Sequence, residues 1–133
     1  MCQEPKSAKK RFLLHRAQQG DVGIWHVVLT EGETLEVVAD SLRLPVQKLL
    51  EWNDLTFESV VAAGDRVYIE QKHRKGRDKT YVVREGERLW DIAQAQGVRL
   101  ERLYAINKFP VGFQPQAGQT IRLRPYGLFE DRP

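Results

Sequence analysis

Cysteine is almost absent from this chain of 133 residues, which has a single one, Cys2. An internal disulfide and a cysteine-based zinc site are therefore excluded. No segment approaches the ~18 consecutive apolar residues of a membrane span, and no apolar stretch follows the basic N-terminus, so we expect a soluble chain without a span or a signal peptide. Cys2 is either a plain thiol or, if the natural chain begins there, the acylated cysteine of a lipoprotein.

A strong excess of either charge is also missing. Lys and Arg number 21 against 18 Asp and Glu, and the net charge of +3 gives only a mild bias towards anionic partners. The three histidines lack ligand-like spacing, and no Ser-His-Asp or Cys-His arrangement is present. We therefore expect no cofactor, no metal and no enzyme activity. With 41% hydrophobic residues the chain can still bury a core.

What the chain does contain is an internal repeat. A shift of 54 residues aligns its two halves without a gap and places Glu31, Gly32, Glu33 and Leu35 on identical residues. Further matches include an identical glycine, Gly64 on Gly118, and a conservative pair beyond it, Ile69 on Leu123. The sequence therefore predicts a tandem repeat.

Each copy shows the same order of patterns. A β-rich run, WHVVL or TYVVR, precedes a glycine turn, and Leu35, Val38, Ala39 and Leu42 then follow helical spacing. Pro45 suits the start of a second helix. Asn53 and Asn107 come one turn beyond the second helix of each copy, where an asparagine can accept the left-handed conformation and tie down the following loop. An alternating run after Gly64 or Gly118 predicts a closing strand. The fold class is α+β: two tandem βααβ modules.

The segments around the modules complete the expected organisation. Residues 11–15 and 24–29 bracket a Gly-Asp-rich turn, which predicts an extra N-terminal hairpin strand on the first module, 11–70. Residues 71–79 are charged and without large apolar side chains, and we interpret them as a basic linker. The second module spans 80–124, residues 1–10 are expected to be disordered, and 125–133 form a C-terminal tail.

These patterns resemble a known family. A strand followed by REGERLWDIA, GVRLERLYAIN and AGQTIRLR is similar to the LysM module, and TEGETLEVVADSLRLPVQKLLEWNDL with AGDRVYIE resembles a more divergent copy. The resemblance implies binding of N-acetylglucosamine-containing glycans such as peptidoglycan or chitin. The tandem arrangement further resembles the C-terminal region of bacterial cell-wall glucosaminidases, which implies a cell-envelope location and a cell-wall hydrolase as partner.

The resemblance also places a glycan groove between the loop after the first strand and the loop after the second helix. Its backbone groups would bond sugar hydroxyl and acetamido groups, and its apolar side chains would pack the acetyl methyl. Arg88 departs from the family pattern, because it replaces the threonine that caps the first helix and cannot accept a hydrogen bond. Carried over by position, the groove residues are Gly32, Glu33, Thr34, Leu35, Asp54, Leu55 and Thr56 in the first copy and Gly86, Glu87, Arg88, Leu89, Lys108, Phe109 and Pro110 in the second.

Three other interpretations compete with glycan binding. Paired carboxylates, Glu31 with Glu33 and Glu85 with Glu87, invite a glycosidase hypothesis, but they flank a turn in a repeat too small for a deep cleft. The basic run 71–79 suggests nucleic-acid binding, yet it lacks the aromatics that stack on bases, so we expect no nucleic-acid partner. A protein-interaction scaffold of the cell envelope remains the main alternative, since the first copy has diverged and offers an edge strand.

Overall fold

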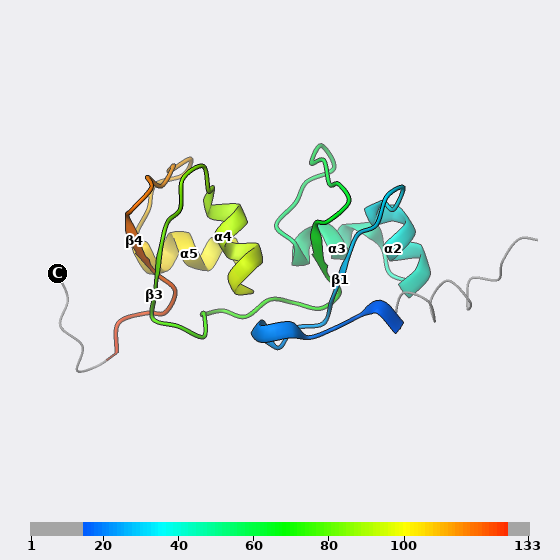
Figure 1. The fold of residues 1–133 in the computed structure, drawn as a ribbon, viewed down its shortest axis with the longest axis horizontal. Coiled ribbons are helices and arrows are strands. Elements are labelled where there is room, and N and C mark those ends of the chain that lie inside the picture. Colours follow the sequence, from blue (N-terminus) through cyan, green and yellow to red (C-terminus); the bar gives the residue numbers. More distant parts are fainter. Residues whose placement is uncertain (1–14, 128–133) are drawn as a thin grey trace, which may run out of the picture. The chain divides into compact units, whose positions relative to one another are not determined.

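The computed structural model describes residues 15–127 and divides after Lys72 into two compact units (Figure 1). The expectations for residues 1–10, for Cys2 and for the end of the tail lie outside the described residues. No helix within 15–127 is both long and apolar enough to cross a membrane. Both units have the predicted order of strand, helix, helix and strand.

In the first unit a two-stranded antiparallel sheet is covered by two helices. Its register pairs His26 with Tyr68 and Val28 with Arg66. A short 3-10 helix, η1, precedes the sheet. The bounds are η1 Gly20–Val22, β1 His26–Val28, α2 Leu35–Leu42, α3 Val46–Trp52 and β2 Arg66–Tyr68.

The second unit repeats this architecture at the same offset of 54 residues. Its register pairs Thr80 with Arg122 and Val82 with Thr120, which are the matched positions of the first sheet. The strands and the first helix match residue for residue, and the second helix is one residue longer. The bounds are β3 Thr80–Val82, α4 Leu89–Gln96, α5 Leu100–Asn107 and β4 Thr120–Arg122. The α+β fold of two βααβ modules is confirmed.

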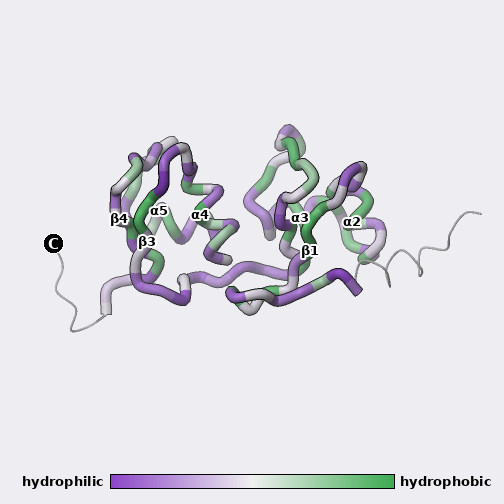
Figure 2. The backbone as a smooth tube through the Cα atoms, in the orientation of Figure 1, coloured by the Kyte–Doolittle hydropathy of each residue, from purple (hydrophilic) through white to green (hydrophobic). Residues whose placement is uncertain are grey.

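Each unit has its own small core between sheet and helices. Val38 and Leu49 are fully buried in the first, and Ile92 and Leu103 occupy the corresponding places in the second. Figure 2 shows the apolar stretches recurring within each unit and a hydrophilic stretch where the chain passes from one unit to the next. A two-stranded sheet is unstable alone, so the helix pair that covers it makes the module possible.

Neither asparagine at the end of the second helices adopts the left-handed conformation. Asn53 has φ −108°, and Asn107 is the last residue of α5; the left-handed residues are instead Asp54 and Lys108, one position later. The Asn53 amide donates to the carbonyls of Leu49 and Tyr68 and accepts from the Tyr68 N–H. Asn107 makes the same three bonds at its matched positions. The asparagines thus join the second helix to the closing strand, a geometry that needs an ordinary φ.

The segment ahead of β1 pairs with it at one position. Gln18 and His26 exchange two backbone hydrogen bonds, of 3.0 and 2.9 Å, and η1 lies between them. The added strand therefore amounts to a single bridge within the described residues, and residues 11–14 of the predicted run lie outside them. Gly20 and Gly23, both at positive φ, turn the chain before it can pair further.

Candidate functional site

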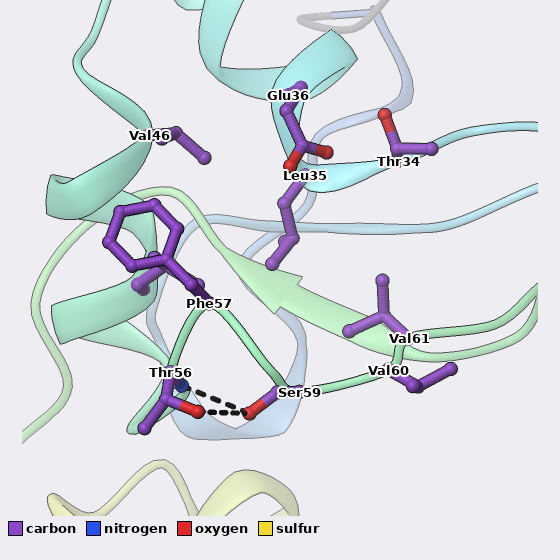
Figure 3. A pocket seen from close by; sticks show the side chains of 10 residues that line it. Thr34, Leu35, Glu36, Val46, Thr56, Phe57, Ser59, Val60 and Val61 are labelled. Carbon is purple, nitrogen blue, oxygen red and sulfur yellow. Dashed lines mark hydrogen bonds between the residues drawn. The ribbon is translucent and has the colours of Figure 1, made fainter.

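A hollow of about 230 Å³ opens on the first unit between the start of α2 and the loop after α3 (Figure 3). Leu35 and Leu50 provide a buried apolar floor, whereas Phe57 and Val60 on the loop are 70% and 91% exposed. Hydroxyl and carboxylate groups share the rim with these apolar side chains. The lining residues are Thr34, Leu35, Glu36, Val46, Leu50, Thr56, Phe57, Ser59, Val60 and Val61.

Local hydrogen bonds fix both sides of this hollow. Thr34 caps α2, since its hydroxyl accepts from the Val37 N–H at 3.2 Å. On the facing loop the Thr56 N–H donates to the Ser59 hydroxyl at 2.9 Å, and the two hydroxyls lie 3.3 Å apart (Figure 3). The rim is therefore preorganised, which lowers the entropy cost of binding a ligand there.

The structure brings together three of the seven groove residues predicted for the first copy. Thr34, Leu35 and Thr56 line the hollow. The other four, Gly32, Glu33, Asp54 and Leu55, lie outside its lining. The sequence reasoning did not name Phe57, Ser59, Val60 or Val61, although their loop directly follows the predicted Thr56.

Glu33 has a structural partner, Arg16. The Arg16 guanidinium donates to both Glu33 carboxylate oxygens at 2.7 Å, and the Thr30 N–H also donates to Glu33 at 2.7 Å. Hydrogen bonding from Arg16 lowers the pKa of Glu33 to about 2, against the opposing effect of burial. A carboxyl group that is ionised at neutral pH cannot act as the general acid that a glycosidase needs.

The Glu33 pKa predicts a loss of stability in acid. Because the folded-state pKa lies below the ordinary value of 4.5, the stabilisation is complete above pH 4.5 and is lost as the pH falls towards 2. We expect the first module to unfold in this range before the second, which amide NMR of the full chain can follow for each module. Glu33→Gln should lose stability at neutral pH and show a flatter acid profile. An identical profile in the variant would contradict this role.

Asp54 is also engaged, in an ion pair with Lys72. The ammonium side chain of Lys72 is fully buried, whereas the Asp54 side chain is 21% exposed. Lys72 was predicted to belong to a solvated linker, and its burial is a correction to that expectation. The Lys72 ammonium also lies over the Tyr68 ring, with Nζ 5.9 Å from the ring centroid, so an aromatic face and a counter-charge both stabilise it inside.

In the second unit the equivalent positions carry different chemistry. Glu87 holds its turn as Glu33 does, since it accepts from the Arg84 N–H and from the Tyr81 hydroxyl. The Gln114 side chain donates to the Glu87 carbonyl at 3.3 Å and joins the two predicted loops. Gly86 sits at the turn with φ +78°. These bonds bring the loops after β3 and after α5 to the same end of the module.

The remaining predicted residues of the second copy lie on these loops and at the start of α4. Leu89 is buried in the core, Lys108 and Pro110 are exposed, and Phe109 stacks on Phe113 with ring centroids 4.1 Å apart. Phe109 and Phe113 are partly buried, and both pack against the core of the second module.

Arg88 does not cap α4 with its side chain. Its N–H instead donates to the Asp91 carboxylate at 2.9 Å, and its guanidinium also donates to Asp91. Asp91 thus satisfies the N–H of the N-cap residue itself, whereas Thr34 in the first copy satisfies an N–H within the helix. The Arg88 guanidinium also lies 5.5 Å from the Trp90 ring centroid, so the rim here is cationic and aromatic where the first copy has Thr34 and Glu36.

No metal centre is evident in the part of the chain that the structure describes, since no three His, Cys, Asp or Glu side chains gather within 15–127. The arrangement therefore offers apolar contact and hydrogen bonds to a ligand. Such a surface suits an uncharged polar molecule with an apolar group.

The chain was compared with solved structures, with curated proteins and with protein-family models. Among solved structures, the spore cortex-lytic enzyme SleL of Bacillus cereus is similar at 20% identity with a TM-score of 0.34 over 77% of this chain, and SleL of Bacillus megaterium QM B1551 at 19% with 0.33 over 76%. This chain spans only 23% and 22% of those two proteins. No curated protein matches the chain significantly.

The family model of the LysM domain matches the chain twice, at residues 27–70 and 81–124. These two ranges fall on the two βααβ modules and together cover more than half of the chain. LysM domains are binding modules that generally take N-acetylglucosamine glycans such as peptidoglycan. The chain belongs to the LysM domain family.

Proposed function

We propose that this chain is a non-catalytic carbohydrate-binding unit that binds the N-acetylglucosamine-containing backbone of peptidoglycan and anchors a cell-wall hydrolase in the cell envelope. The observation that carries the proposal is the hollow of the first module. It lies between the two loops that the family resemblance assigns to the glycan, and it combines an apolar floor with hydroxyl groups on its rim.

The chemistry of the hollow suits an N-acetylated sugar. Leu35, Leu50 and Val46 offer apolar contact to an acetyl methyl group, while Thr56 and Ser59 offer hydroxyls to the amide and the ring hydroxyls. At about 230 Å³ the hollow is smaller than the ~300–1,000 Å³ of pockets that enclose drug-sized ligands, so it fits one sugar unit of a polymer.

Two such modules on one chain compensate for a small site. A single shallow groove binds weakly, but a second module held on the same chain meets the polymer at a high effective concentration. The proposed function therefore uses the tandem arrangement itself, with avidity of about 10²–10⁴ over one module when both sites engage the same glycan strand.

Phe57→Ala tests this site without disturbing the fold. The side chain lines the hollow but is 70% exposed, so we expect stability to change by no more than about 0.5 kcal/mol. Binding of N-acetylglucosamine oligomers by the first module should weaken about five- to tenfold, because apolar contact to the sugar is lost. Titration of the full chain followed by amide NMR measures each module separately.

Val37→Ala is the matched control. Val37 is an exposed apolar residue of α2 that does not line the hollow, so this variant should bind as the parent does.

In the second module, the double variant Arg88→Ala with Lys108→Gly tests the predicted groove loops. Glycine suits position 108 because the φ of Lys108 is +55°. If neither module shows shifts with any N-acetylglucosamine oligomer, the glycan proposal fails and the scaffold alternative is favoured.

A further inference from the structure

The two modules differ sharply in charge. Residues 15–72 carry ten Asp and Glu against five Lys and Arg, whereas residues 73–127 carry five against eleven. The modest net charge of the whole chain, +3, hides this contrast. A difference of this size between two copies of one fold points to different electrostatic partners.

Much of the positive charge in the second module lies on a strap that the structure holds in place. The strap, residues 73–79, bonds through the His73 N–H and carbonyl to Gly97 and Arg99, and through the Gly76 N–H to the Leu123 carbonyl. A Cβ atom at Gly76 would stand 2.7 Å from the Leu123 Cβ, so the strap packs closely on the end of β4. Its basic side chains are therefore presented on a fixed backbone.

Basic residues on both flanks lie next to the strap. Arg99, at the start of α5, donates its backbone N–H to the strap, and Arg124 donates from its guanidinium to the Gly76 carbonyl at 3.1 Å. Within the strap Asp78 is the single acid. We call this surface the basic face; its residues are Arg74, Lys75, Arg77, Lys79, Arg99 and Arg124.

The fold does not require these charges. In the first module the six positions that match the basic face include two acids, Asp21 and Glu70, and no basic residue; the others are Gly20, Gly23, Trp25 and Pro45. Four of these positions precede β1, where the first module has η1 and the Gln18–His26 bridge in place of a strap, and its βααβ fold forms without any of the six cations. The six cations are therefore a feature of the second module alone.

The basic face is also separate from the predicted groove. It lies against the end of α4, the start of α5 and the end of β4, whereas the groove loops lie at the start of α4 and after α5. One module can therefore bind a neutral sugar at one end and an anion at the other.

We propose that the basic face binds anionic groups, phosphodiesters or carboxylates, of a cell-wall polysaccharide. This inference rests on the proposed function, because a polymer held in the groove brings its own or attached anionic groups to the same module. The segment 73–79 has no Phe, Trp or Tyr on which bases stack, and the exposed large apolar residues described in this module, Val82 and Val111, lie outside it. These features favour a polysaccharide over single-stranded nucleic acid or a membrane.

The test compares full-chain variants on defined polymers. Arg74→Gln with Lys75→Gln removes two exposed charges of the basic face; Arg43→Asn with Lys48→Gln removes two from the first module as the matched control. The probes are soluble poly(glycerol phosphate), peptidoglycan stripped of phosphodiester polymers with its carboxyl groups free or amidated, chitin, and duplex DNA. The two anionic probes distinguish phosphodiester from carboxylate recognition, and chitin tests the groove alone.

We expect the basic-face variant to lose affinity for an anionic polymer on the order of tenfold, with a salt dependence shallower by about 1–2 in the log–log slope, while chitin binding and thermal melts stay unchanged. Equal losses in the basic-face and control variants overturn the proposal, as does tighter binding of the parent to duplex DNA than to either anionic polymer. Retention on chitin without salt-sensitive binding to any polyanion leaves the groove function standing and refutes the basic face. Salt-sensitive binding to a polyanion, without retention on chitin or on the amidated peptidoglycan, supports the basic face and refutes the groove.

Discussion

Asp54→Asn is expected to destabilise the first module by about 3 kcal/mol. The exchange keeps the shape of the side chain and its tolerance of φ +53°, but it leaves the fully buried Lys72 ammonium without its counter-charge. Removing one partner of a buried pair costs about 3–5 kcal/mol, and the lower end applies here because the amide oxygen still accepts a hydrogen bond. Denaturant unfolding of the full chain, followed by amide NMR, measures the effect in each module.

The charge explanation has its own control and a pH signature. Adding Lys72→Met to Asp54→Asn should recover most of the loss, since an apolar side chain of similar length is tolerated where an unpaired charge is not. Burial lowers the pKa of Lys72, an effect that Asp54 opposes. In Asp54→Asn the unfolded chain binds the lysine proton more tightly than the folded one, so stability should rise as the pH approaches 10. A pH-independent deficit would show that packing, not charge, is responsible.

The repeat explains why so much of the fold followed from the sequence. Strand and helix positions recur at an offset of 54 because both copies keep the same hydrophobic periodicity and the same turn glycines. These features act locally, and the sheet register follows once strand and helix faces are set. The length of the added N-terminal strand did not follow from the sequence. A Gly-Asp turn predicts that two segments pair but not over how many residues, and here they pair only between Gln18 and His26.

The side chains that differed from expectation are those whose partners lie far along the chain. Lys72 looks like part of a solvated run, and only Asp54, 18 residues earlier, explains its burial. Asn53 follows a helix, where a left-handed φ is common, but its side-chain amide is hydrogen-bonded to Tyr68, 15 residues later. Propensity describes the local backbone, and tertiary hydrogen bonds override it.

Among the predicted groove residues, those positioned by local structure line the hollow, whereas Glu33 is held by a partner far along the chain. Thr34 and Leu35 line the hollow because the helix start fixes their direction, which the sequence pattern already determines. Glu33 lies outside the lining of the hollow, and Arg16, 17 residues earlier, donates to both of its carboxylate oxygens. The loop 56–61 has no hydrophobic periodicity. The sequence pattern therefore did not predict that Phe57 and Ser59 line the hollow.

Ile92→Ala is expected to destabilise the second module by about 2–5 kcal/mol. The side chain is fully buried and is one of only eight buried residues in the described core of this module, so its removal leaves a cavity that few neighbours can fill. Glycan affinity of that module should fall only to the extent that it unfolds. Amide NMR of the full chain reads the first module in the same sample as an internal reference.

Val111→Ala is the matched comparison, because this side chain of the second module is fully exposed and should change stability by no more than about 0.5 kcal/mol. The equivalent core change in the first module, Val38→Ala, should destabilise that module and leave the second unaffected, since the two buried clusters share no residue. If Ile92→Ala weakens the amide protection of both modules equally, the separate cores described above do not act independently, and the stability of each module depends on its neighbour.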